Sequence, residues 1–431
     1  MNPRKIVKAV IPKKVFKQIE PYGHLGESVA LNSLNGFPAK GLKVIGVTGT
    51  NGKTTTCFMI HRMLTEAGYK VGLMTTVAYG VGEDIKPQMH HMTNVAVPEL
   101  MSRLKMMRTA KVDWVILETT SHALAQYRVW GVPYSVAVMT NITHEHLAYH
   151  GTFERYRDAK RRLFKLANKN KNGLRTGVIN AEDPSAELFA ADIANPLTYG
   201  VKKGDLRAVD LKMAPSGSSY KAQIDGDSYD IVCHLPGSFN VYNSLAAIGV
   251  GRTLGLTKTQ IEQGIAALKS VEGRMTRVDA GQDFEVIVDY AHTPDSYEKL
   301  FKDLVPMVKG KIIVLFGSLG GGDRAKRPLQ GELAGKYCDE VVLTEEDDRR
   351  DDGLNILEEI AAGAEKAGKV RDKNLFLIHD RPQAIAFAVS RAKKGDTVLL
   401  LGKGHEKTIE RADGEHPWNE VEEARKALRS L

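Results

Sequence analysis

Apolar residues along the chain form short runs that alternate with segments of helical periodicity. In the first half, runs typical of buried strands occupy positions 42–47, 70–76, 114–118 and 135–141, and apolar residues at helical spacing fill the intervals. Strands that alternate with helices predict a parallel sheet covered by helices on both faces. Polar residues that end these strands, such as Glu118 and Asn141, are then expected at the carboxyl edge of the sheet, where such folds bind ligands.

A second series of the same kind follows, so three parts of the chain can be distinguished. Further strands are expected at 284–289, 311–316, 340–343, 375–378 and 397–401, and alternating residues with several glycines at 200–234 predict a small antiparallel excursion. We expect an α/β chain with a short basic helical segment over 1–41, a central domain with a parallel sheet over 42–272, and a second, Rossmann-like α/β domain over 273–431. The first segment is expected to pack as a helix on the next domain, with a membrane-surface helix as the alternative.

Composition narrows the classes of protein that fit. The three cysteines, Cys57, Cys233 and Cys338, lie far apart and form no metal-binding spacing, so a cytoplasmic, reducing location is expected. No apolar run is long enough for a bilayer span and no signal peptide opens the chain, so we expect no membrane partner. A net charge of +8 without a nucleic-acid-binding motif favours a small anionic substrate such as ATP, and no nucleic acid is expected as a partner. Nothing in the sequence argues for more than a monomer.

A glycine-rich stretch, Thr-Gly-Thr-Asn-Gly-Lys-Thr-Thr-Thr at 48–56, connects the first strand to a helical pattern. Glycines at this position let backbone N–H groups approach a phosphate, so Lys53 would contact the outer phosphates and Thr54 would ligate magnesium. Val47 stands where the usual P-loop spacing has glycine, and Gly49 replaces it nearer the lysine, which gives a shortened loop. The alternative is a turn that merely contains Gly-Lys-Thr, which the flanking strand and helix disfavour. The central domain is therefore expected to be of the P-loop type.

Three other polar residues have two interpretations each. Glu118 ends a strand beside the loop, so it either holds the magnesium ion that bridges phosphates or faces water. His146 shares a loop with His144, and it is either a solvent-exposed histidine or a ligand of a second cation. Lys160 falls within a helical pattern over 153–166, and on that pattern alone it is an exposed helix lysine.

Taken together, these segments resemble motifs of the Mur ligase family, and they follow one another in the same order along the chain. The stretch at 48–56 resembles the ATP loop of the family. The match continues through Glu118 with Thr120-Ser121-His122-Ala123-Leu124, Asn141 with His146 and Tyr149-His150-Gly151, Leu235-Pro236-Gly237 with Phe239-Asn240-Val241-Tyr242-Asn243, Gly273-Arg274, and Asp289-Tyr290-Ala291-His292. Within the family, the chain is most similar to the members that join a diamino acid to UDP-N-acetylmuramoyl-L-alanyl-D-glutamate. The resemblance implies an ATP-dependent amide ligase of peptidoglycan precursor synthesis that works through an acyl phosphate.

The resemblance also implies roles for individual residues. The implied catalytic residues are Lys53, Glu118, His146 and Lys160, and two magnesium ions are held by Thr54, Glu118, His146 and a carbamylated Lys160. The implied ATP contacts are Gly49, Thr50, Asn51, Gly52, Lys53, Thr54, Thr55, Asn243, Arg274, Asp289 and His292. The muramoyl dipeptide precursor and the diamino acid are expected to contact Thr93, Thr120, Ser121, Gln126, Arg128, Arg324, Asp347, Arg349, Gly402 and Glu406.

The chain departs from the family pattern in ways that bear on its substrates. Arg349 keeps the cation that would pair with the distal carboxylate of meso-diaminopimelate, which favours that amino acid over lysine, but Asp347 replaces an asparagine and would suit an ammonium group. The N-terminal UDP-binding domain of the family needs about 100 residues. Only 47 residues precede Thr48, so we expect the usual form of that domain to be missing. Two alternatives stay open: a related ligase with another acceptor, such as folylpolyglutamate or a modified cell-wall precursor, and a non-catalytic ATP-binding module that partners another enzyme.

Overall fold

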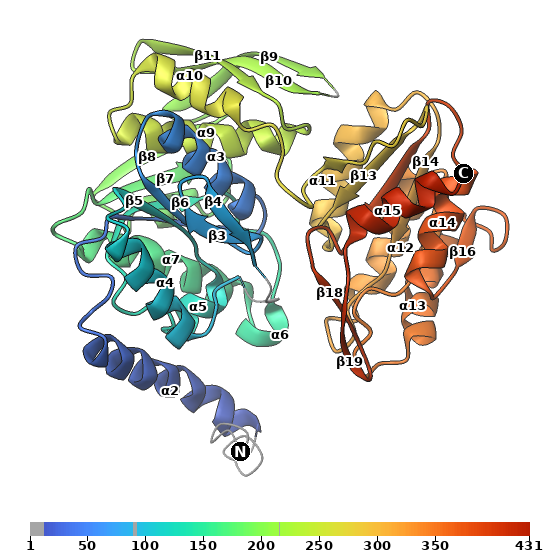
Figure 1. Cartoon of the computed structure of the whole chain (residues 1–431), viewed down its shortest axis with the longest axis horizontal. Coiled ribbons are helices and arrows are strands. Elements are labelled where there is room, and N and C mark those ends of the chain that lie inside the picture. Colours follow the sequence, from blue (N-terminus) through green and yellow to red (C-terminus); the bar gives the residue numbers. More distant parts are fainter. Residues whose placement is uncertain (1–12, 89–92, 215) are drawn as a thin grey trace. The chain divides into compact units, whose positions relative to one another are not determined.

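The computed structural model describes residues 13–88, 93–214 and 216–431 (Figure 1). Residues 1–12 of the expected basic helical segment lie outside the described residues. The chain divides into two compact units. The first comprises the described residues up to Leu211 together with Tyr220–Val232 and Val241–Ala267, and the second comprises Lys212–Ser219, Cys233–Asn240 and Leu268–Leu431.

The first unit is built around a mostly parallel sheet. In the described part of the chain its eleven strands follow the order β11-β10-β9-β8-β7-β6-β1-β5-β2-β3-β4. Their bounds are β1 Val44–Thr48, β2 Val71–Met74, β3 Ala78–Val81, β4 Asp84–Pro87, β5 Trp114–Glu118, β6 Tyr134–Met139, β7 Thr176–Asn180, β8 Asn195–Gly200, β9 Leu206–Ala214, β10 Gly217–Ile224 and β11 Asp227–Cys233. Strand β1 pairs in parallel with β5 and β6, so its carboxyl end lies between Glu118 and Met139.

Helices cover both faces of the first sheet because alternate strand residues are apolar and buried on each side. Val44, Val115 and Met139 belong to a core that also includes residues of α4, α5, α7 and α8. Ile45 and Ile116, of the opposite alternation, are equally buried, and α3 packs against β1, β2, β5 and α10. The helices are α3 Lys53–Glu66, α4 Val97–Thr109, α5 Ser121–Ala125, α6 Leu147–His150, α7 Phe153–Lys169, α8 Ala186–Ala190, α9 Ser238–Thr253 and α10 Lys258–Ala267.

A further helix, α2 (Lys13–Leu34), packs on the first unit beside α4. The Ser28 hydroxyl donates to the Tyr127 carbonyl over 3.1 Å, and the Asn32 amide donates to the Trp130 carbonyl over 3.2 Å. Both acceptors lie just after α5, so α2 supports the segment that carries two of the expected substrate contacts, Gln126 and Arg128. None of the helices in the described part of the chain has the length and apolar content needed to span a bilayer.

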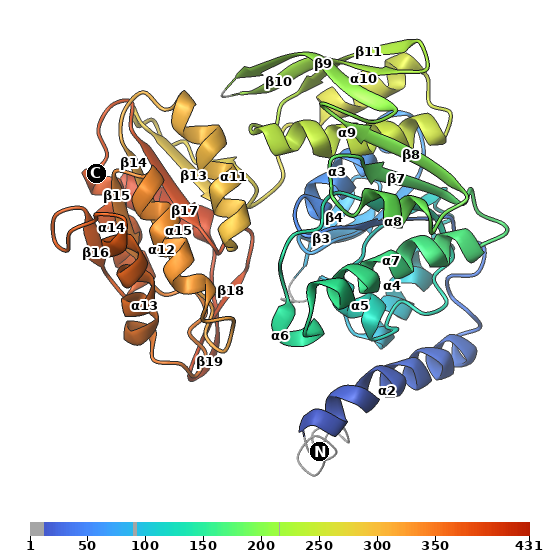
Figure 2. The same ribbon diagram turned by 180° about the vertical axis from the view of Figure 1, so that it is seen from behind.

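The second unit is a smaller three-layer α/β fold. Its main sheet has the order β12-β13-β17-β14-β15-β16, and all neighbours except β12 and β13 run parallel. The strands are β12 Thr276–Arg277, β13 Glu285–Asp289, β14 Ile312–Phe316, β15 Glu340–Leu343, β16 Leu375–Leu377 and β17 Thr397–Leu401, and β18 Thr408–Arg411 pairs with β19 Gly414–Pro417 as a separate hairpin. Helices α11 Pro294–Leu304, α12 Lys326–Tyr337 and α13 Gly353–Lys366 lie on one face (Figure 2), and α14 Arg381–Arg391 and α15 Glu420–Arg429 lie on the other (Figure 1).

The predicted fold class, a central parallel-sheet domain followed by a second α/β domain, is confirmed. Strands expected at 114–118, 340–343 and 397–401 have those bounds in the structure. The short strands β3, β4, β18 and β19 were not expected, because four residues carry too little alternation to stand out. The domain limits at 41/42 and 272/273 stay a prediction.

Candidate active site

The glycine-rich stretch forms the turn between β1 and α3, and α3 begins at Lys53. Gly49 and Gly52 both have positive φ angles, of 153° and 82°. A Cβ atom at Gly49 would collide with the Thr140 hydroxyl, and one at Gly52 would collide with the Asn243 amide. Glycine is therefore required at both positions, and the bare backbone leads into the start of a helix, which is the place where helices bind phosphate.

Neighbouring strands hold this loop in one conformation. The Thr50 amide donates to the Asn141 carbonyl over 2.7 Å, and the side chain of Asn141 both accepts from the Asn51 amide and donates to the Asn51 carbonyl, each over 3.0 Å. The Thr50 hydroxyl lies 2.9 Å from the Tyr156 hydroxyl. Lys53 Nζ donates to the Thr50 carbonyl over 2.8 Å, so the ammonium group curls back over the loop, where an outer phosphate would lie.

Glu118 is buried at the end of β5 and collects donors from two other elements. Its carboxylate accepts from the Thr54 hydroxyl over 2.9 Å, and from both the amide and the hydroxyl of Thr76 over 3.0 Å. The interpretation in which Glu118 faces water is therefore wrong. A buried carboxylate beside a hydroxyl at the first turn of the loop helix is an oxygen donor set that fits magnesium, so these residues suit the expected ion.

Lys160 is buried on α7, with 2% of its surface exposed, so the interpretation as an exposed helix lysine is wrong. Its Nζ donates to the Gly49 carbonyl over 2.6 Å and lies 4.7 Å from the centre of the Tyr156 ring. Burial, followed by the repulsion of Lys53, holds the pKa of the Lys160 amine well below its usual value, against the opposing attraction of Glu145 and Glu118. The physical reason for the burial is the helix period, because Tyr156, Lys160, Leu163 and Phe164 share the face that packs on the sheet.

His146 is exposed and belongs to a group of aromatic rings around α5, α6 and α7. Its ring centre lies 4.7 Å from that of His122 and 6.2 Å from that of Tyr156, and its φ of 55° is unusual for a residue other than glycine. His146 and Lys160 thus both lie near the Tyr156 ring. Burial, and then the neighbouring His146, lower the pKa of His122 to about 3 and that of His150 to about 4.

The expected acceptor contacts lie close together, next to Glu118. Thr93 accepts from the Thr76 hydroxyl over 2.9 Å, and Asn94 accepts from the backbone and the hydroxyl of Thr120 over 2.8 and 2.9 Å. Arg128 is buried and donates to the Asn94 carbonyl. The other two members are Ser121, whose hydroxyl lies 3.1 Å from His150 Nε2, and Gln126, which ends α5 and bonds the side chain of Tyr149.

Asn243, expected to contact nucleotide, lies on α9 beside the loop. Its side-chain oxygen is 3.4 Å from the Thr56 hydroxyl and occupies the space against Gly52. The structure therefore brings together Gly49, Thr50, Asn51, Gly52, Lys53, Thr54, Thr55, Asn243, Glu118, His146 and Lys160 within the first unit.

The second unit holds the remaining nucleotide candidates as a separate group. The Asp289 carboxylate accepts from the amides of Met275 and Ala291, each over 2.7 Å, and burial raises its pKa against the opposing effect of Arg274. The Arg274 guanidinium lies over the Tyr290 ring, with 4.7 Å to the ring centre. His292 Nδ1 lies 2.8 Å from the Tyr290 carbonyl, so all three candidates lie around Tyr290, in the turn after β13.

A buried charge cluster lies after β15 and β17 in the second unit. Lys403 Nζ, which is fully buried, contacts Asp347 over 2.8 Å and Glu406 over 2.5 Å. Burial lowers the pKa of this ammonium, and the carboxylates of Glu406 and Asp347 more than offset that effect and hold the pKa above its usual value. Gly402, with a φ of 99°, packs on the buried carboxylate of Glu346, whose pKa is raised by burial. Asp347, Gly402 and Glu406 are therefore neighbours, as expected.

The two arginines expected beside this cluster have different surroundings. Arg349 lies two positions after Asp347, and its Nε lies 2.9 Å from the Glu410 carboxylate. Arg324 is 66% exposed and forms its ion pair with Glu359, which also binds Arg327. The structure thus groups Arg349 with Asp347 and Glu406, whereas the Arg324 side chain extends toward α13.

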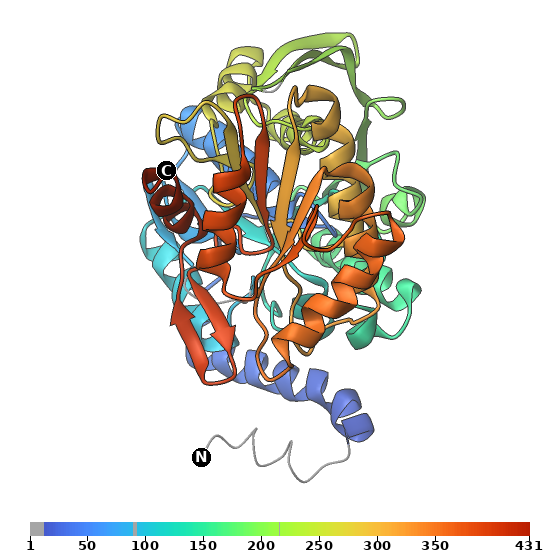
Figure 3. The ribbon, with the colours of Figure 1, turned by 90° about the vertical axis from the view of Figure 1, so that its right-hand side faces the viewer.

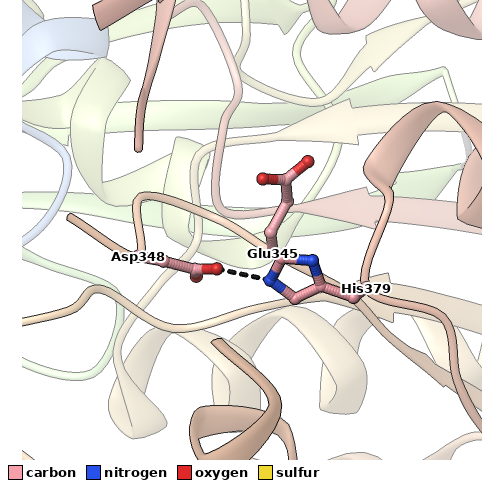
Figure 4. A group of neighbouring side chains, drawn as sticks. All are labelled: Glu345, Asp348 and His379. Carbon is pink, nitrogen blue, oxygen red and sulfur yellow. Dashed lines mark hydrogen bonds and ion pairs between the residues drawn. The ribbon is translucent and has the colours of Figure 1, made fainter. Parts of the chain in front are cut away.

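Glu345, Asp348 and His379 offer three potential metal-ligand atoms within 4.8 Å of one another. Figure 4 shows His379 facing Asp348, with 2.6 Å between Nε2 and the carboxylate, whereas the Glu345 carboxylate points away from them. That carboxylate accepts two bonds from Arg411, over 2.7 and 2.8 Å. These donor atoms already have protein partners, so we interpret the group as ion pairs that fix the segment before Arg349.

The sequence did not point to several residues of the loop site in the first unit and of the charge cluster around Lys403 in the second. Tyr156 and Asn94 organise the first group, and Lys403 and Glu346 occupy the centre of the second. Tyr156 had a usable signal, because it lies one helical turn before Lys160. Lys403 and Asp347 are 56 positions apart, so no local pattern could have paired them.

The chain matches known protein families and individual sequences. Residues 47–251 match the Mur ligase middle domain, and residues 273–404 match the Mur ligase glutamate ligase domain. The chain is 41% identical over 408 residues to a UDP-N-acetylmuramyl-tripeptide synthetase of Roseiflexus sp. (strain RS-1), covering 92% of this chain and 80% of the relative. It is also 41% identical over 373 residues to a UDP-N-acetylmuramoyl-L-alanyl-D-glutamate--2,6-diaminopimelate ligase of Syntrophomonas wolfei subsp. wolfei, covering 86% and 75%.

Solved structures give the same result. A UDP-N-acetylmuramoyl-L-alanyl-D-glutamate--2,6-diaminopimelate ligase matches with a TM-score of 0.63 at 30% identity, covering 96% of this chain and 83% of the other. The folylpolyglutamate synthase of Mycobacterium tuberculosis, complexed with ADP and AMPPCP, matches with a TM-score of 0.73 over 88% and 92% of the two chains, but its 19% identity supports the fold alone. The two domain matches and the length of these alignments show that the chain belongs to the Mur ligase family.

Proposed function

We propose that this chain joins meso-diaminopimelate to the D-glutamate carboxylate of UDP-N-acetylmuramoyl-L-alanyl-D-glutamate in peptidoglycan precursor synthesis. As a member of the Mur ligase family it is an ATP-dependent ligase. The observation that carries the proposal is the convergence of Lys53, Glu118 and Lys160 on one loop in a chain whose relatives are named for this reaction. ATP would phosphorylate the acceptor carboxylate, and the amine of the diamino acid would displace phosphate from the resulting acyl phosphate.

The loop at 48–56 is proposed to bind the triphosphate. Its bare glycine backbone and the start of α3 favour anions, and Lys53 would follow the phosphoryl group as its charge moves to the acceptor. Asn243 closes one side of the loop. Arg274, Asp289 and His292 are the proposed nucleotide contacts of the second unit, and Thr55 completes the first turn of the loop helix.

Magnesium, when bound, would neutralise the negative charge of the phosphates during transfer. Thr54 and Glu118 are the proposed ligands of one ion. The second is assigned to His146 and to a carbamate on Lys160. Carbamylation needs a neutral amine, and the lowered pKa of Lys160, caused by burial and by Lys53, keeps a larger fraction of that amine neutral.

The acceptor is proposed to lie along Thr93, Thr120, Ser121, Gln126 and Arg128, which adjoin Glu118. Arg128 is buried with its Nη1 committed to Asn94, so its charge is fixed in place and would attract a carboxylate of the dipeptide. The diamino acid is assigned to the second unit, at Asp347, Arg349, Gly402 and Glu406, with Arg324 retained as a candidate on the resemblance.

The two other functions considered from the sequence gain no support. The likeness to folylpolyglutamate synthase extends to the fold, and the sequence relatives reported above are named as muramyl peptide ligases. A non-catalytic ATP-binding module would not need Lys53, Glu118 and Lys160 together, whereas here all three surround one loop.

The test is amino-acid-dependent phosphate release. Purified protein with ATP and magnesium would receive each acceptor, the muramoyl dipeptide nucleotide or a folate, together with each of meso-diaminopimelate, L-lysine and L-glutamate. Release that requires both the muramoyl acceptor and meso-diaminopimelate supports the proposal, and mass spectrometry of the product identifies the new amide. Phosphate release that requires folate and L-glutamate would instead contradict the proposal and support the folylpolyglutamate alternative. The monomeric state and cytoplasmic location stay predictions, and light scattering with the purified protein tests the first.

A further inference from the structure

The ion pair between Arg349 and Glu410 is open to solvent. Their side chains are 42% and 36% exposed, and Nε of Arg349 lies 2.9 Å from Oε2 of Glu410. Glu410 belongs to β18 of the β18–β19 hairpin, which stands apart from the main sheet of the second unit (Figure 3). A ligand that reaches Arg349 therefore meets Glu410 as well.

Backbone contacts fix this pair in position. The Arg349 amide donates to the Glu410 carbonyl over 3.1 Å, and the Glu410 amide donates to the Asp347 carboxylate over 2.8 Å. Arg349 Nη1 also donates to the Gly320 carbonyl over 3.3 Å. Arg349 has a φ of 57°, a conformation that residues other than glycine seldom adopt and that concentrates at functional sites. Arg349 and Glu410 are thus held side by side.

Each partner keeps one polar atom for a ligand. Within the described residues, neither Nη2 of Arg349 nor Oε1 of Glu410 has a hydrogen-bond partner. The nearby carboxylates of Asp347 and Glu406 are already bound to the ammonium of Lys403. Asp347 is buried, whereas Glu410 is 36% exposed, so Glu410 offers a solvent-accessible carboxylate oxygen to a new cation.

We propose that Glu410 is a specificity-determining residue that binds the distal ammonium of the incoming diamino acid while Arg349 binds its distal carboxylate. This inference rests on the proposed function and extends it. The far end of meso-diaminopimelate carries an ammonium and a carboxylate on one carbon, so it presents opposite charges side by side, as Arg349 and Glu410 do. When the ligand binds, Arg349 and Glu410 give up their ion pair with each other, and each pairs with the ligand group of opposite charge. Lysine supplies the ammonium alone and leaves Arg349 without a carboxylate.

Three amino acids offered as substrates distinguish the contact with Arg349 from the contact with Glu410. Meso-diaminopimelate has both distal groups, 2-aminopimelate has the carboxylate alone, and L-lysine has the ammonium alone. For Glu410→Gln, which keeps the shape and removes the charge, we expect the KM for meso-diaminopimelate to rise about tenfold and that for 2-aminopimelate to change less than twofold. For Arg349→Gln, we expect the KM to rise for both amino acids that carry the carboxylate.

Asp413→Asn is the matched control, because it removes one negative charge from the exposed tip of the same hairpin. It is expected to leave all three KM values unchanged. If Glu410→Gln raises the KM for 2-aminopimelate as much as that for meso-diaminopimelate, or raises neither, the assignment of Glu410 is overturned. Glu410→Asp, which retains the charge, should restore discrimination if the glutamine variant is unstable, and calorimetric binding of meso-diaminopimelate gives a second readout. Failure of the unmodified protein to use or bind any of the three would instead overturn the proposed function.

Discussion

The amine of Lys160 donates a 2.6 Å hydrogen bond to the carbonyl of Gly49, the first glycine of the proposed phosphate-binding loop. A lysine on α7 is thereby fixed at the turn between β1 and α3, although the two residues are 111 positions apart. Burial and the nearby charge of Lys53 lower the pKa of the amine, so the Lys160 ammonium loses its proton more readily than a solvated lysine does. A structural role alone would not require an ionisable group here.

Replacement of Lys160 by alanine is expected to reduce ligase activity on the order of a hundredfold or more, because the proposed carbamate that holds the second magnesium ion cannot form. Added short-chain carboxylic acids are expected to restore part of the rate by supplying the missing carboxylate. Phosphate-release assays with and without acetate check this. Lys165→Ala, on the same helix and half exposed, is the control and should keep the parent rate. Full activity in Lys160→Ala would refute the assignment.

Replacement of Lys53 by alanine is expected to lower the rate of ATP-dependent phosphate release by about a hundredfold or more. The ammonium lies over the loop through its bond to the Thr50 carbonyl, and its charge would stabilise the phosphoryl group during transfer. Steady-state kinetics measure the change, with the exposed Lys105→Ala on α4 as control. A variant that turns over at the parent rate would mean that the loop does not bind the transferred phosphate.

Glu118→Gln is expected to raise the magnesium concentration needed for half-maximal activity by about tenfold or more. Glutamine preserves the size of the side chain and can still accept from Thr54 and Thr76, but it removes the negative charge that a hard divalent cation prefers. Magnesium titrations of the variant and the parent protein measure the shift. An unchanged magnesium dependence with reduced activity would show that Glu118 acts by positioning the loop alone.

Much of the fold followed from the sequence because buried parallel strands are continuous apolar runs. Trp114–Glu118, Glu340–Leu343 and Thr397–Leu401 have the bounds that their patterns predict. The grouping of the candidate site residues in the first unit could also be predicted from the sequence, since strand ends and a glycine-rich turn mark one edge of a sheet.

Other features could not be read from local patterns. The helical pattern over 153–166 alone suggested an exposed Lys160, and only the family resemblance implied a role for it, although its helical spacing to Tyr156 and Leu163 assigns it to the buried face. Pairs such as Arg349 with Glu410 are 61 positions apart and depend on how the hairpin returns to the loop. The local pattern of apolar and polar residues in either segment does not predict that contact.

The histidines near the loop are expected to make stability sensitive to acid. The pKa of His122 is held at about 3 by burial and by His146, whereas an unfolded histidine titrates near 6.5. Between these values the unfolded state binds the extra proton, so stability is lost as the pH falls below about 6.5. Between pH 7 and pH 5, the free energy of unfolding of His122→Phe should fall by about 2 kcal/mol less than that of the parent protein. Urea unfolding at both pH values checks this, with the exposed His416→Phe as control. Equal losses in the parent and the variant would show that His122 is not held neutral.

Lys403→Met is expected to destabilise the second unit by about 3 to 5 kcal/mol, because the buried carboxylate of Asp347 and the mostly buried carboxylate of Glu406 lose their shared cation. Unfolding of the variant and the parent at pH 7 measures the difference. Addition of Asp347→Asn should recover part of it, since one uncompensated buried charge is then removed. Lys407→Met provides the control: its ion pair with Glu272 is partly exposed, so its loss should cost less than about 1 kcal/mol. If Lys403→Met is as stable as the parent, the two acids must be neutral in the native protein, and the proposed diamino acid site would hold fewer charges than the geometry implies.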